Sequence, residues 1–428
     1  MANWQSLIKE QLEKDRDEAI ALLQEWVQHS SVQGEEASIQ ESIAKTLADM
    51  GLDVDLWVME GDELLQHPYF VSPRTVFDGS PNVVGVWKGA GGGRSIILNG
   101  HVDVVPAGDR AQWSDDPFSG KVEDGKLYGR GATDMKGGNL SSLLAISVLK
   151  KLGVKLKGDV IFQSVVEEES GGAGTLATIL RGYKADAALV PEPTNMKIFP
   201  KQQGSMWFRL SVKGRSAHGG TRYEGVSAID KSIAVVQAIG QLEKERNDRL
   251  DDPLYEKLPI PIPINIGVIG GGKWPSSVAD LVTLEGRMGV APGEQMEDAK
   301  AEMAAALKKL AQVDPWFAEH PVELEWYGAR WVPGAVAEDH PLMDILQRQF
   351  AAVTGERAIV EASPWGTDGG LLTALADTPA IVVGPGVTQV AHYPNEYIVL
   401  DDVFRCAEIF ALALIEWCGI ADTNSQNE

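Results

Sequence analysis

The sequence predicts an α/β fold in which a mixed, mainly parallel sheet is covered by helices and carries a smaller inserted α+β domain. Apolar runs of strand length alternate with helical patterns, and these runs are continuously apolar, as in sheets that are buried on both faces. The middle of the chain differs, because a strand there alternates apolar and polar residues. We therefore expect one domain from residues 1–204 and 329–428, and an inserted domain from residues 205–328.

The bulk composition is that of a globular protein large enough for two domains. The chain has 428 residues, of which 44% are hydrophobic and 23% are charged. Its net charge of −23 argues against nucleic acid or an anionic membrane as a partner. This charge is spread along the chain, which favours general solubility over a role in attracting a cationic or zwitterionic substrate.

The two cysteines give no sign of a disulfide framework. Cys406 and Cys418 lie twelve residues apart in one expected helix, so their Cα atoms are too far apart for a bridge. The N-terminal stretch is polar and lacks the apolar centre of a signal peptide, and no run reaches the length of a membrane span. A cytoplasmic protein is the expectation.

Apolar periodicity and turn residues locate the elements of the larger domain. Residues 60–80 contain several turn formers and are expected to form a loop. The expected helices are 4–29, 36–50, 139–152, one after the glycines at 171–174, and 401–418. The expected strands are 54–58, 82–88, 95–98 running on to His101, 159–166, 185–190 and 380–383.

The inserted domain has its own succession of elements. Its expected strands are 207–212, 265–269, 281–286 and 322–326, and its expected helices are 228–246 and 294–310. The order β-α-β-β-α-β is typical of a ferredoxin-like sandwich. These strands cannot easily extend a sheet whose own strand resumes at residue 380, which favours a separate domain.

Polar side chains follow the apolar strands of the larger domain. In open α/β sheets, sites form outside the carboxyl ends of the strands. The residues in question are His101, Glu168, Glu169, Glu192 and, at the end of a longer loop, His392. Five such residues at one expected edge of the sheet indicate a common site.

His101 and Asp134 stand out within this set. Asp103 lies two residues after His101, so both side chains can point to the same side of an extended chain. The Asp103 carboxylate could then hold the proton of one ring nitrogen and leave the other nitrogen free for a metal. Asp134 lies in a glycine-rich loop before a helix, and its two equivalent oxygens suit a bridging role.

The donor types favour a metal site. Two histidines and three carboxylates without a thiolate favour zinc, cobalt or manganese over a structural cysteine site. Five ligands are too many for one tetrahedral ion with an open position. They suit two ions that share a carboxylate, about 3.5–4 Å apart, as in two-metal hydrolytic sites.

Each of these residues also has a simpler interpretation. Asp134 could cap the following helix, although the turn at residues 135–138 separates it from the first good helical residue. The acidic run 167–169 would ordinarily be a solvated surface, but it is attached to an apolar strand. Glu192 is held stiffly between two prolines. The remaining histidines without such contexts are His29, His67, His320 and His340.

The pattern resembles a family of two-metal peptidases and deacylases that contains acetylornithine deacetylase, succinyl-diaminopimelate desuccinylase, aminoacylase and glutamate carboxypeptidase. It is most similar to the acetylornithine deacetylase-like members. The matching stretches, in the family's order, are 100–106, 113–118, 125–138, 167–174, 192–194, 214–219 and 392–396.

This resemblance implies a role for each site residue. One metal would be held by His101, Asp134 and Glu192, and the other by Asp134, Glu169 and His392. Asp103 would orient His101, and Glu168 would be the general base. His218 resembles a histidine that reaches the partner subunit's active site, which implies a homodimer; its simpler interpretation is a local structural role in its loop.

Further positions resemble the substrate-binding residues of the family. These are Arg287, which would grip a carboxylate, Asn265, Gly366 and Thr367. Two features depart from the family pattern: the sequence Ser-Ser-Val-Ala at 276–279, where many relatives have Asn-x-Val-Pro, and the long insertion at 60–80, which has no obvious role.

The resemblance implies a homodimeric two-metal hydrolase of linear amides. The first substrate class is an N-acyl amino acid of the acetylornithine type. Alternatives on the same scaffold are a dipeptidase or carboxypeptidase, a succinyl-diaminopimelate desuccinylase and a deformylase of formylated amines. An inactive metal-dependent binding protein is a further alternative, which the extra carboxylate of Glu168 disfavours. The sequence leaves the acyl group and the metal open.

Overall fold

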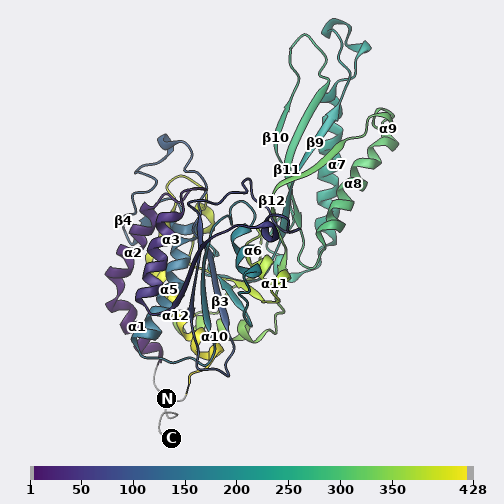
Figure 1. Cartoon of the computed structure of the whole chain (residues 1–428). Helices are drawn as coiled ribbons and strands as arrows, with labels where there is room; N and C mark the ends of the chain where they lie inside the picture. Colours follow the sequence, from purple (N-terminus) through teal and green to yellow (C-terminus); the bar gives the residue numbers. More distant parts are fainter. Residues whose placement is uncertain (1–3, 422–428) are drawn as a thin grey trace. The chain divides into compact units, whose positions relative to one another are not determined.

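The computed structural model describes residues 4–421, which divide into two compact units (Figure 1). The first contains the chain up to Lys201, Gly334–Ser363 and the residues from Thr367 onward. The second contains Gln202–Pro333 and the short segment Pro364–Gly366. The second unit therefore extends beyond residues 205–328 at both ends, and a piece of chain distant in sequence joins it.

The first unit is built on a nine-stranded sheet with the strand order β1-β2-β6-β3-β7-β15-β8-β13, and β14 also pairs with β8. The strands β6, β3, β7 and β15 pair in parallel at its centre. Antiparallel pairs of β1 with β2, β2 with β6, and β15 with β8 flank them. The expected mixed α/β architecture with a mainly parallel central sheet is confirmed.

The strands of the first unit are two to seven residues long. They are β1 (Asp53–Val58), β2 (Pro81–Trp87), β3 (Ile96–His101), β4 (Lys121–Glu123), β5 (Lys126–Tyr128), β6 (Val160–Val165), β7 (Ala188–Val190), β8 (Ile198–Gln202), β13 (Gly334–Ala335), β14 (Val360–Ser363), β15 (Ala380–Val382) and β16 (Tyr397–Val399). The strands β16, β5 and β4 form a separate small sheet, which the sequence did not predict because each has only three residues.

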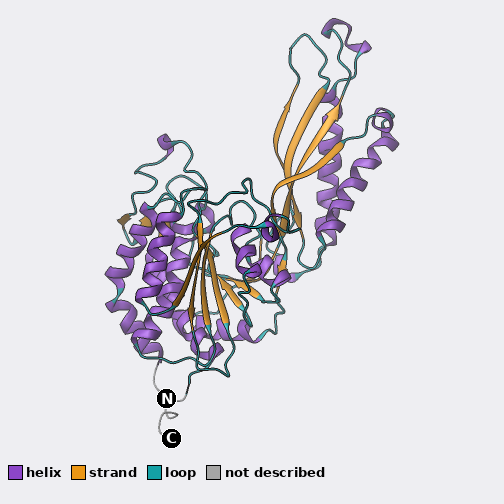
Figure 2. Ribbon diagram, viewed as in Figure 1, coloured by secondary structure: helices purple, strands orange, loops and turns teal. Residues whose placement is uncertain are grey.

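Helices cover both faces of the central sheet (Figure 2). The helices of the first unit are α1 (Trp4–Lys14), α2 (Arg16–Gln28), α3 (Ala37–Asp49), α4 (Asp62–Leu65), α5 (Gly137–Lys151), α6 (Ala173–Leu180), α10 (Pro341–Thr354), α11 (Gly369–Leu375) and α12 (Leu400–Cys418). The helices α5 and α12 pack together, and α6 packs on α11. Both cysteines are buried, unpaired residues of α12, as expected.

Two helical expectations are corrected. The single helix expected over 4–29 is broken at Asp15, which accepts a hydrogen bond from the Gln11 side chain and pairs with Lys151 at 3.0 Å. Asp is a poor residue for a helix interior because its side chain competes for local hydrogen bonds. The 60–80 segment is mostly loop, but it contains the one-turn helix α4.

The second unit has the order β9 (Gly204–Lys213), α7 (Ala228–Arg249), β10 (Ile264–Gly271), β11 (Leu281–Val290), α8 (Met296–Val313), the short α9 (Trp316–Glu319) and β12 (Glu323–Trp331). Its strands form a four-stranded antiparallel sheet in the order β10-β11-β9-β12. The alternating residues of β9 bury Phe208, Leu210 and Val212 in a core that is shared with α7 and α8.

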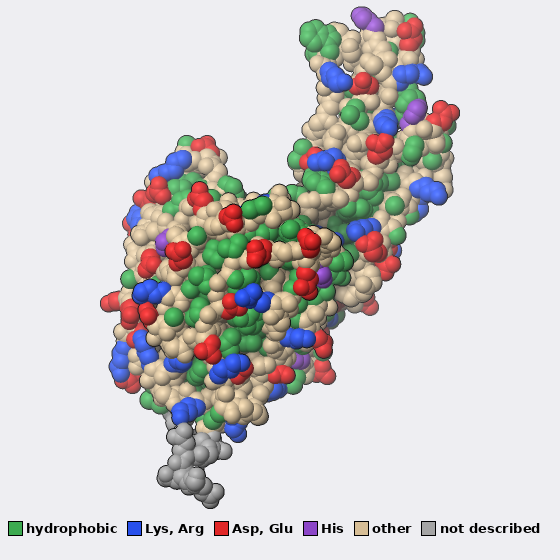
Figure 3. All heavy atoms as spheres, viewed as in Figure 1, with side chains coloured by type: hydrophobic (Ala, Val, Ile, Leu, Met, Phe, Trp, Pro, Cys, Tyr) green, Lys and Arg blue, Asp and Glu red, His purple; other side chains and the backbone are tan. Residues whose placement is uncertain are grey.

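The surface agrees with a dispersed net charge. On the face drawn in Figure 3, acidic and basic side chains are interspersed. Among the helices within residues 4–421, none combines the length and apolar character needed to cross a membrane.

Candidate metal centre

Three adjacent parallel strands deliver side chains to one edge of the sheet in the first unit. β3 ends at His101, which pairs with Val165 at the end of β6, two residues before Glu167. On the other side of β3 lies β7, which ends at Val190, two residues before Glu192. Parallel pairing therefore brings together segments that are up to 91 positions apart in the sequence.

The backbone of His101 is held by the helix that covers it. Asn139 at the start of α5 donates its side-chain N–H to the His101 carbonyl oxygen at 2.7 Å. This contact requires a glycine at position 100, because a Cβ there would lie 1.9 Å from the Asn139 Oδ1 atom. A close approach of this kind is a common reason for glycine in a strand.

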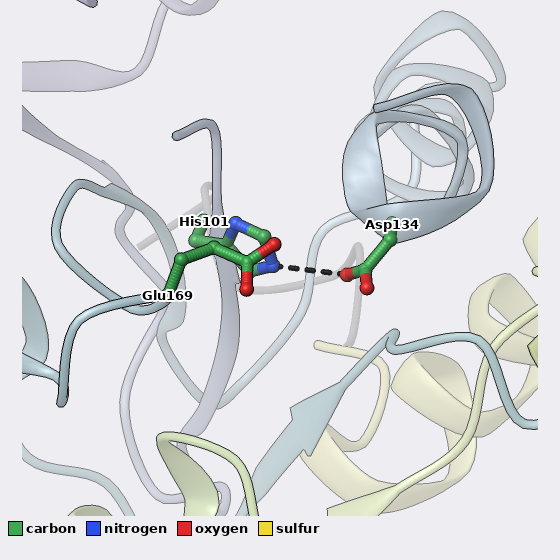
Figure 4. Close-up of side chains that lie close together, drawn as sticks. All are labelled: His101, Asp134 and Glu169. Carbon is green, nitrogen blue, oxygen red and sulfur yellow. Dashed lines mark hydrogen bonds and ion pairs between the residues drawn. The ribbon is translucent and has the colours of Figure 1, made fainter. Parts of the chain in front are cut away.

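Asp134 lies between two imidazoles. It belongs to the irregular turn Ala132–Lys136, which directly precedes α5. Its Oδ1 atom is 3.2 Å from Nε2 of His101, and its Oδ2 atom is 3.2 Å from Nε2 of His392. Each oxygen of one carboxylate thus faces a different histidine, the arrangement expected of a bridging ligand (Figure 4 shows the His101 side).

The other two expected carboxylate ligands complete the cluster. Glu192 Oε1 is 3.8 Å from His101 Nε2, and Glu169 Oε1 is 3.0 Å from His392 Nε2. Ligand atoms of His101, Asp134 and Glu169 lie within 4.8 Å of one another, as do those of His101, Glu168 and Glu192. The structure therefore brings all five residues predicted as ligands into one site, together with Glu168.

The expected role of the Asp103 carboxylate is corrected in its details. The Nδ1 atom of His101 lies 2.7 Å from the backbone oxygen of Asp103, whereas the Asp103 carboxylate is 3.6 Å away. That carboxylate instead accepts the backbone N–H groups of Glu168 at 3.3 Å and Glu169 at 3.1 Å. Asp103 thus orients the ring through its main chain and holds the acidic turn through its side chain.

The electrostatics of the site favour bound cations. Burial raises the pKa of both Glu168 and Glu192 well above the usual range of a glutamate, and it raises the pKa of Asp103 to about 8. Burial would lower the pKa of His392, but hydrogen bonds and the charges of Asp134 and Glu169 raise it to about 11. Buried carboxylates around two imidazoles are a donor set that fits divalent ions of the zinc type.

Arg130 and Glu396 are site residues that the sequence did not single out. The Glu396 carboxylate accepts the backbone N–H groups of Thr133 at 3.0 Å and Asp134 at 3.2 Å. Arg130 donates to Glu396 at 2.5 Å and to the His392 carbonyl oxygen at 3.2 Å. This buried pair ties two ligand loops together. Arg130 lies in the stretch 125–138 and Glu396 in the stretch 392–396. A charged residue inside each of these stretches was the sequence signal that could have identified the pair.

The remaining predicted residues lie mainly in the second unit. His218 is exposed, and its Nδ1 atom accepts the Gly220 N–H at 3.0 Å. Arg287 and Asn265 are direct partners on the antiparallel strands β11 and β10, so their side chains share a face of that sheet. Gly366 belongs to the second unit and Thr367 to the first. Thr367 is buried, and its hydroxyl accepts the Gly369 N–H at the start of α11.

An α/β sheet that gathers histidines and carboxylates at its strand ends is typical of a metal-dependent hydrolase. The chain belongs to peptidase family M20/M25/M40, whose model matches residues 97–416. As a member of this family, it is a metal-dependent hydrolase that acts on amide bonds.

Relatives and solved structures cover nearly the whole chain. An N-formyl-4-amino-5-aminomethyl-2-methylpyrimidine deformylase from Halalkalibacterium halodurans is 32% identical, over 96% of this chain and 98% of the relative. An M20 family metallo-carboxypeptidase from Sulfolobus solfataricus shares the fold with a TM-score of 0.73 and 18% identity, over 93% of this chain and 98% of that one. A dinuclear metal-binding M20 peptidase from Bacillus subtilis has a TM-score of 0.61 and 18% identity, over 95% and 99%.

Proposed function

We propose that the protein is a two-metal amidohydrolase that removes a small acyl group from an N-acyl amino acid, as acetylornithine deacetylase-like enzymes do. The observation that carries the substrate class is the state of Arg287. This half-buried guanidinium makes no hydrogen bond or ion pair within residues 4–421. Burial lowers its pKa, so an anion bound there would be favoured. The carboxylate of an amino acid is such an anion.

The chain offers a defined set of residues for the two ions. His101, Asp134 and Glu192 would hold one, and Asp134, Glu169 and His392 would hold the other. Zinc is the first candidate, with cobalt or manganese as alternatives. When bound, such ions polarise an amide carbonyl and lower the pKa of a water molecule to about 7.

Glu168 would do the proton work of the reaction. It is buried beside the ligands His101 and Glu192. Its carboxylate belongs to neither proposed ligand set, so it can accept a proton and release it again. It would take a proton from the attacking water and deliver it to the nitrogen of the leaving amine.

A deformylase of aminomethylpyrimidines is the second candidate function. The relative from Halalkalibacterium halodurans favours it, because that deformylase is 32% identical to this chain over nearly its full length. A formylated aminomethylpyrimidine has no carboxylate for Arg287. Dipeptidase, carboxypeptidase and succinyl-diaminopimelate desuccinylase activities remain further candidates, and their substrates do carry a carboxylate.

Substrate turnover and one substitution separate these candidates. The metal-loaded protein is assayed on N-acetyl, N-formyl and N-succinyl amino acids, on dipeptides and on the N-formyl aminomethylpyrimidine. Arg287→Met should raise KM for the carboxylate substrates about 10- to 100-fold, since a hydrogen bond to a charged group contributes about 1.5–3 kcal/mol. The control Arg209→Met removes a guanidinium that is already paired with Glu285 and Glu325 on the same sheet.

The outcome assigns the substrate class. An N-acyl amino acid that is turned over fastest, with a KM sensitive to Arg287→Met and insensitive to Arg209→Met, supports the proposal. Fastest turnover of the formylated pyrimidine, with KM unchanged in Arg287→Met, would replace it with the deformylase. A dipeptide as the best substrate would replace it with a peptidase.

We also propose that the second unit is a ferredoxin-like lid through which two copies associate as a homodimer. Three apolar side chains at positions i, i+4 and i+7 of α7 face solvent: Ile229 is 50% exposed, Ile233 54% and Val236 41%. An apolar stripe that is exposed on a helix indicates an association surface. His218 in the same unit is exposed and, by resemblance, would serve the partner subunit's active site.

A further inference from the structure

The 60–80 segment packs as an ordered part of the first unit. Phe77 and Ser80 are buried, as is Leu64 of α4. The Phe70 and Phe77 rings meet edge to face at 6.4 Å, and the Arg74 guanidinium lies 5.2 Å from the centre of the Phe77 ring. Arg74 is thus carried by an anchored stretch of chain rather than by a free surface loop.

Arg74 bridges two fully buried carboxylates. Its Nε atom donates to Glu167 Oε1 at 2.5 Å, and its Nη2 atom lies 3.3 Å from Glu36 Oε1. The side chains of Glu167 and Glu36 have no exposed surface, while that of Arg74 is 20% exposed. Among the described residues, Arg74 is the cation that pairs with both buried carboxylates, so its loss would leave both without a cationic partner.

The Glu167 carboxylate has a full set of donors. Besides Arg74, the hydroxyls of Ser72 at 2.8 Å and Ser170 at 2.5 Å donate to Oε2. The Gln33 side chain donates at 2.9 Å to the same oxygen. Two of these donors, Arg74 and Ser72, come from the 60–80 segment. The 60–80 segment thus binds the Glu167 side chain through two of its residues.

Glu167 begins the turn that carries the reactive carboxylates. Its backbone has φ of 66°, in the left-handed region that few non-glycine residues adopt. Its carbonyl oxygen accepts the Gly172 N–H at 2.7 Å. The next two residues are Glu168 and Glu169, whose N–H groups are held by Asp103. The turn is therefore fixed from one side by Asp103 and from the other by the group around Arg74.

We propose that Arg74, supported by Ser72, is a positioning residue: by clamping the buried Glu167 carboxylate, it holds Glu168 and Glu169 in place for catalysis and metal binding. This assigns a role to the 60–80 segment and rests on the proposed function for its catalytic part. The metal-binding part can be measured without any substrate.

The test compares Arg74→Met, Arg74→Lys and Ser72→Ala with the wild-type protein. The matched control is Arg181→Met, because Arg181 also pairs through two nitrogens with a carboxylate, Asp55, and lies 4.6 Å from the centre of an aromatic ring, Trp57. Within residues 4–421, Arg181 makes no hydrogen bond or ion pair with a residue of the candidate metal centre. Each protein is titrated with Co²⁺ alone, followed by visible absorption, and its thermal unfolding, kcat and KM are measured.

Arg74→Met should weaken the binding of the Co²⁺ ion held by Glu169 about 10- to 100-fold, the range found when a residue that supports a metal ligand is lost. It should lower kcat by a similar factor with KM within about threefold, because substrate contacts are untouched. Arg74→Lys should recover part of both losses, since one ammonium reaches one carboxylate only. Ser72→Ala should shift both quantities in the same direction by a smaller factor.

Several results would overturn the inference. One is Co²⁺ affinity and kcat within threefold of wild type in Arg74→Met; another is an equal loss in Arg181→Met. If Arg74→Met does not fold, Ser72→Ala decides, and unchanged Co²⁺ binding in that variant counts against the clamp. A wild-type protein that binds Co²⁺ but turns over no amide contradicts the proposed function only, and the Co²⁺ titrations still test the positioning role.

Discussion

Glu168 and Glu169 are adjacent in sequence and both lie near His101, but their other neighbours differ. Glu169 Oε1 lies 3.0 Å from His392 Nε2. A carboxylate oxygen of Glu168 lies within 4.8 Å of ligand atoms of His101 and Glu192. If Glu168 is the general base, Glu168→Gln should retain both metals and lower kcat about 10²- to 10⁴-fold, the usual contribution of a positioned base. Metal content by elemental analysis and kcat on the best amide substrate check this.

The neighbouring residue supplies the control for this prediction. Glu169→Gln replaces a proposed ligand, so it should lower the bound metal from two ions toward one as well as reducing kcat. Loss of metal from Glu168→Gln to the same extent would make Glu168 a ligand, and near-normal kcat would refute its role as the base.

At the scale of elements, α5 begins in close contact with the loop that carries Glu192. A Cβ at Gly138 would lie 1.9 Å from the Pro191 carbonyl oxygen. Gly138→Ala should therefore push α5 and this loop apart, destabilising the fold by about 1–3 kcal/mol, as overpacking does. It should also weaken metal binding, because Glu192 follows Pro191 directly.

A glycine-to-alanine substitution in α7 should have the opposite effect on the stability of the fold. Gly240 is an exposed residue inside that helix, and a Cβ there would meet nothing within 4 Å. Gly240→Ala should stabilise the protein by about 0.5–1 kcal/mol, because alanine loses less conformational freedom in a helix. Thermal unfolding of the apo and Co²⁺-loaded variants measures both effects. An equal melting temperature for the two variants would contradict the packing argument.

At the scale of the whole molecule, the exposed stripe on α7 predicts an oligomeric state. Ile233→Glu places a charge in the middle of that stripe, so it should convert a dimer to a monomer in light scattering. The control Gln241→Glu adds the same charge at another exposed position of α7 and should remain dimeric. A monomeric wild-type protein would contradict the prediction directly.

Mixed dimers test whether His218 acts across that interface. His218→Ala and Glu168→Gln should each be nearly inactive alone. After mixing and random reassociation, half of the dimers are heterodimers with one intact site, so about a quarter of wild-type activity should return. Activity that stays at the level of the separate variants would place His218 in its own subunit's reaction or outside catalysis.

The cluster of candidate ligands could be predicted from the sequence, because each of its residues follows a recognisable local pattern. His101 and Glu192 directly follow apolar strands, and Asp134 lies in a glycine-rich loop. The parallel order of β6, β3 and β7 then brings these ends together. The break at Asp15 and the strands β4, β5 and β16 were missed, because single polar residues and three-residue strands give no periodic signal.

The sequence by itself determined the fold class and the kinds of side chain at the site, histidines and carboxylates. Both could be predicted because strand ends and glycine-rich loops are local features of the sequence. Only the tertiary structure decided which groups hold those residues in place. Arg74 meets Glu167 across 93 positions, and Arg130 meets Glu396 across 266. The Asp103 carboxylate lies 3.6 Å from His101 and also accepts the backbone N–H groups of the acidic turn. Contacts between distant segments depend on how the chain packs, and buried charges must find their partners there.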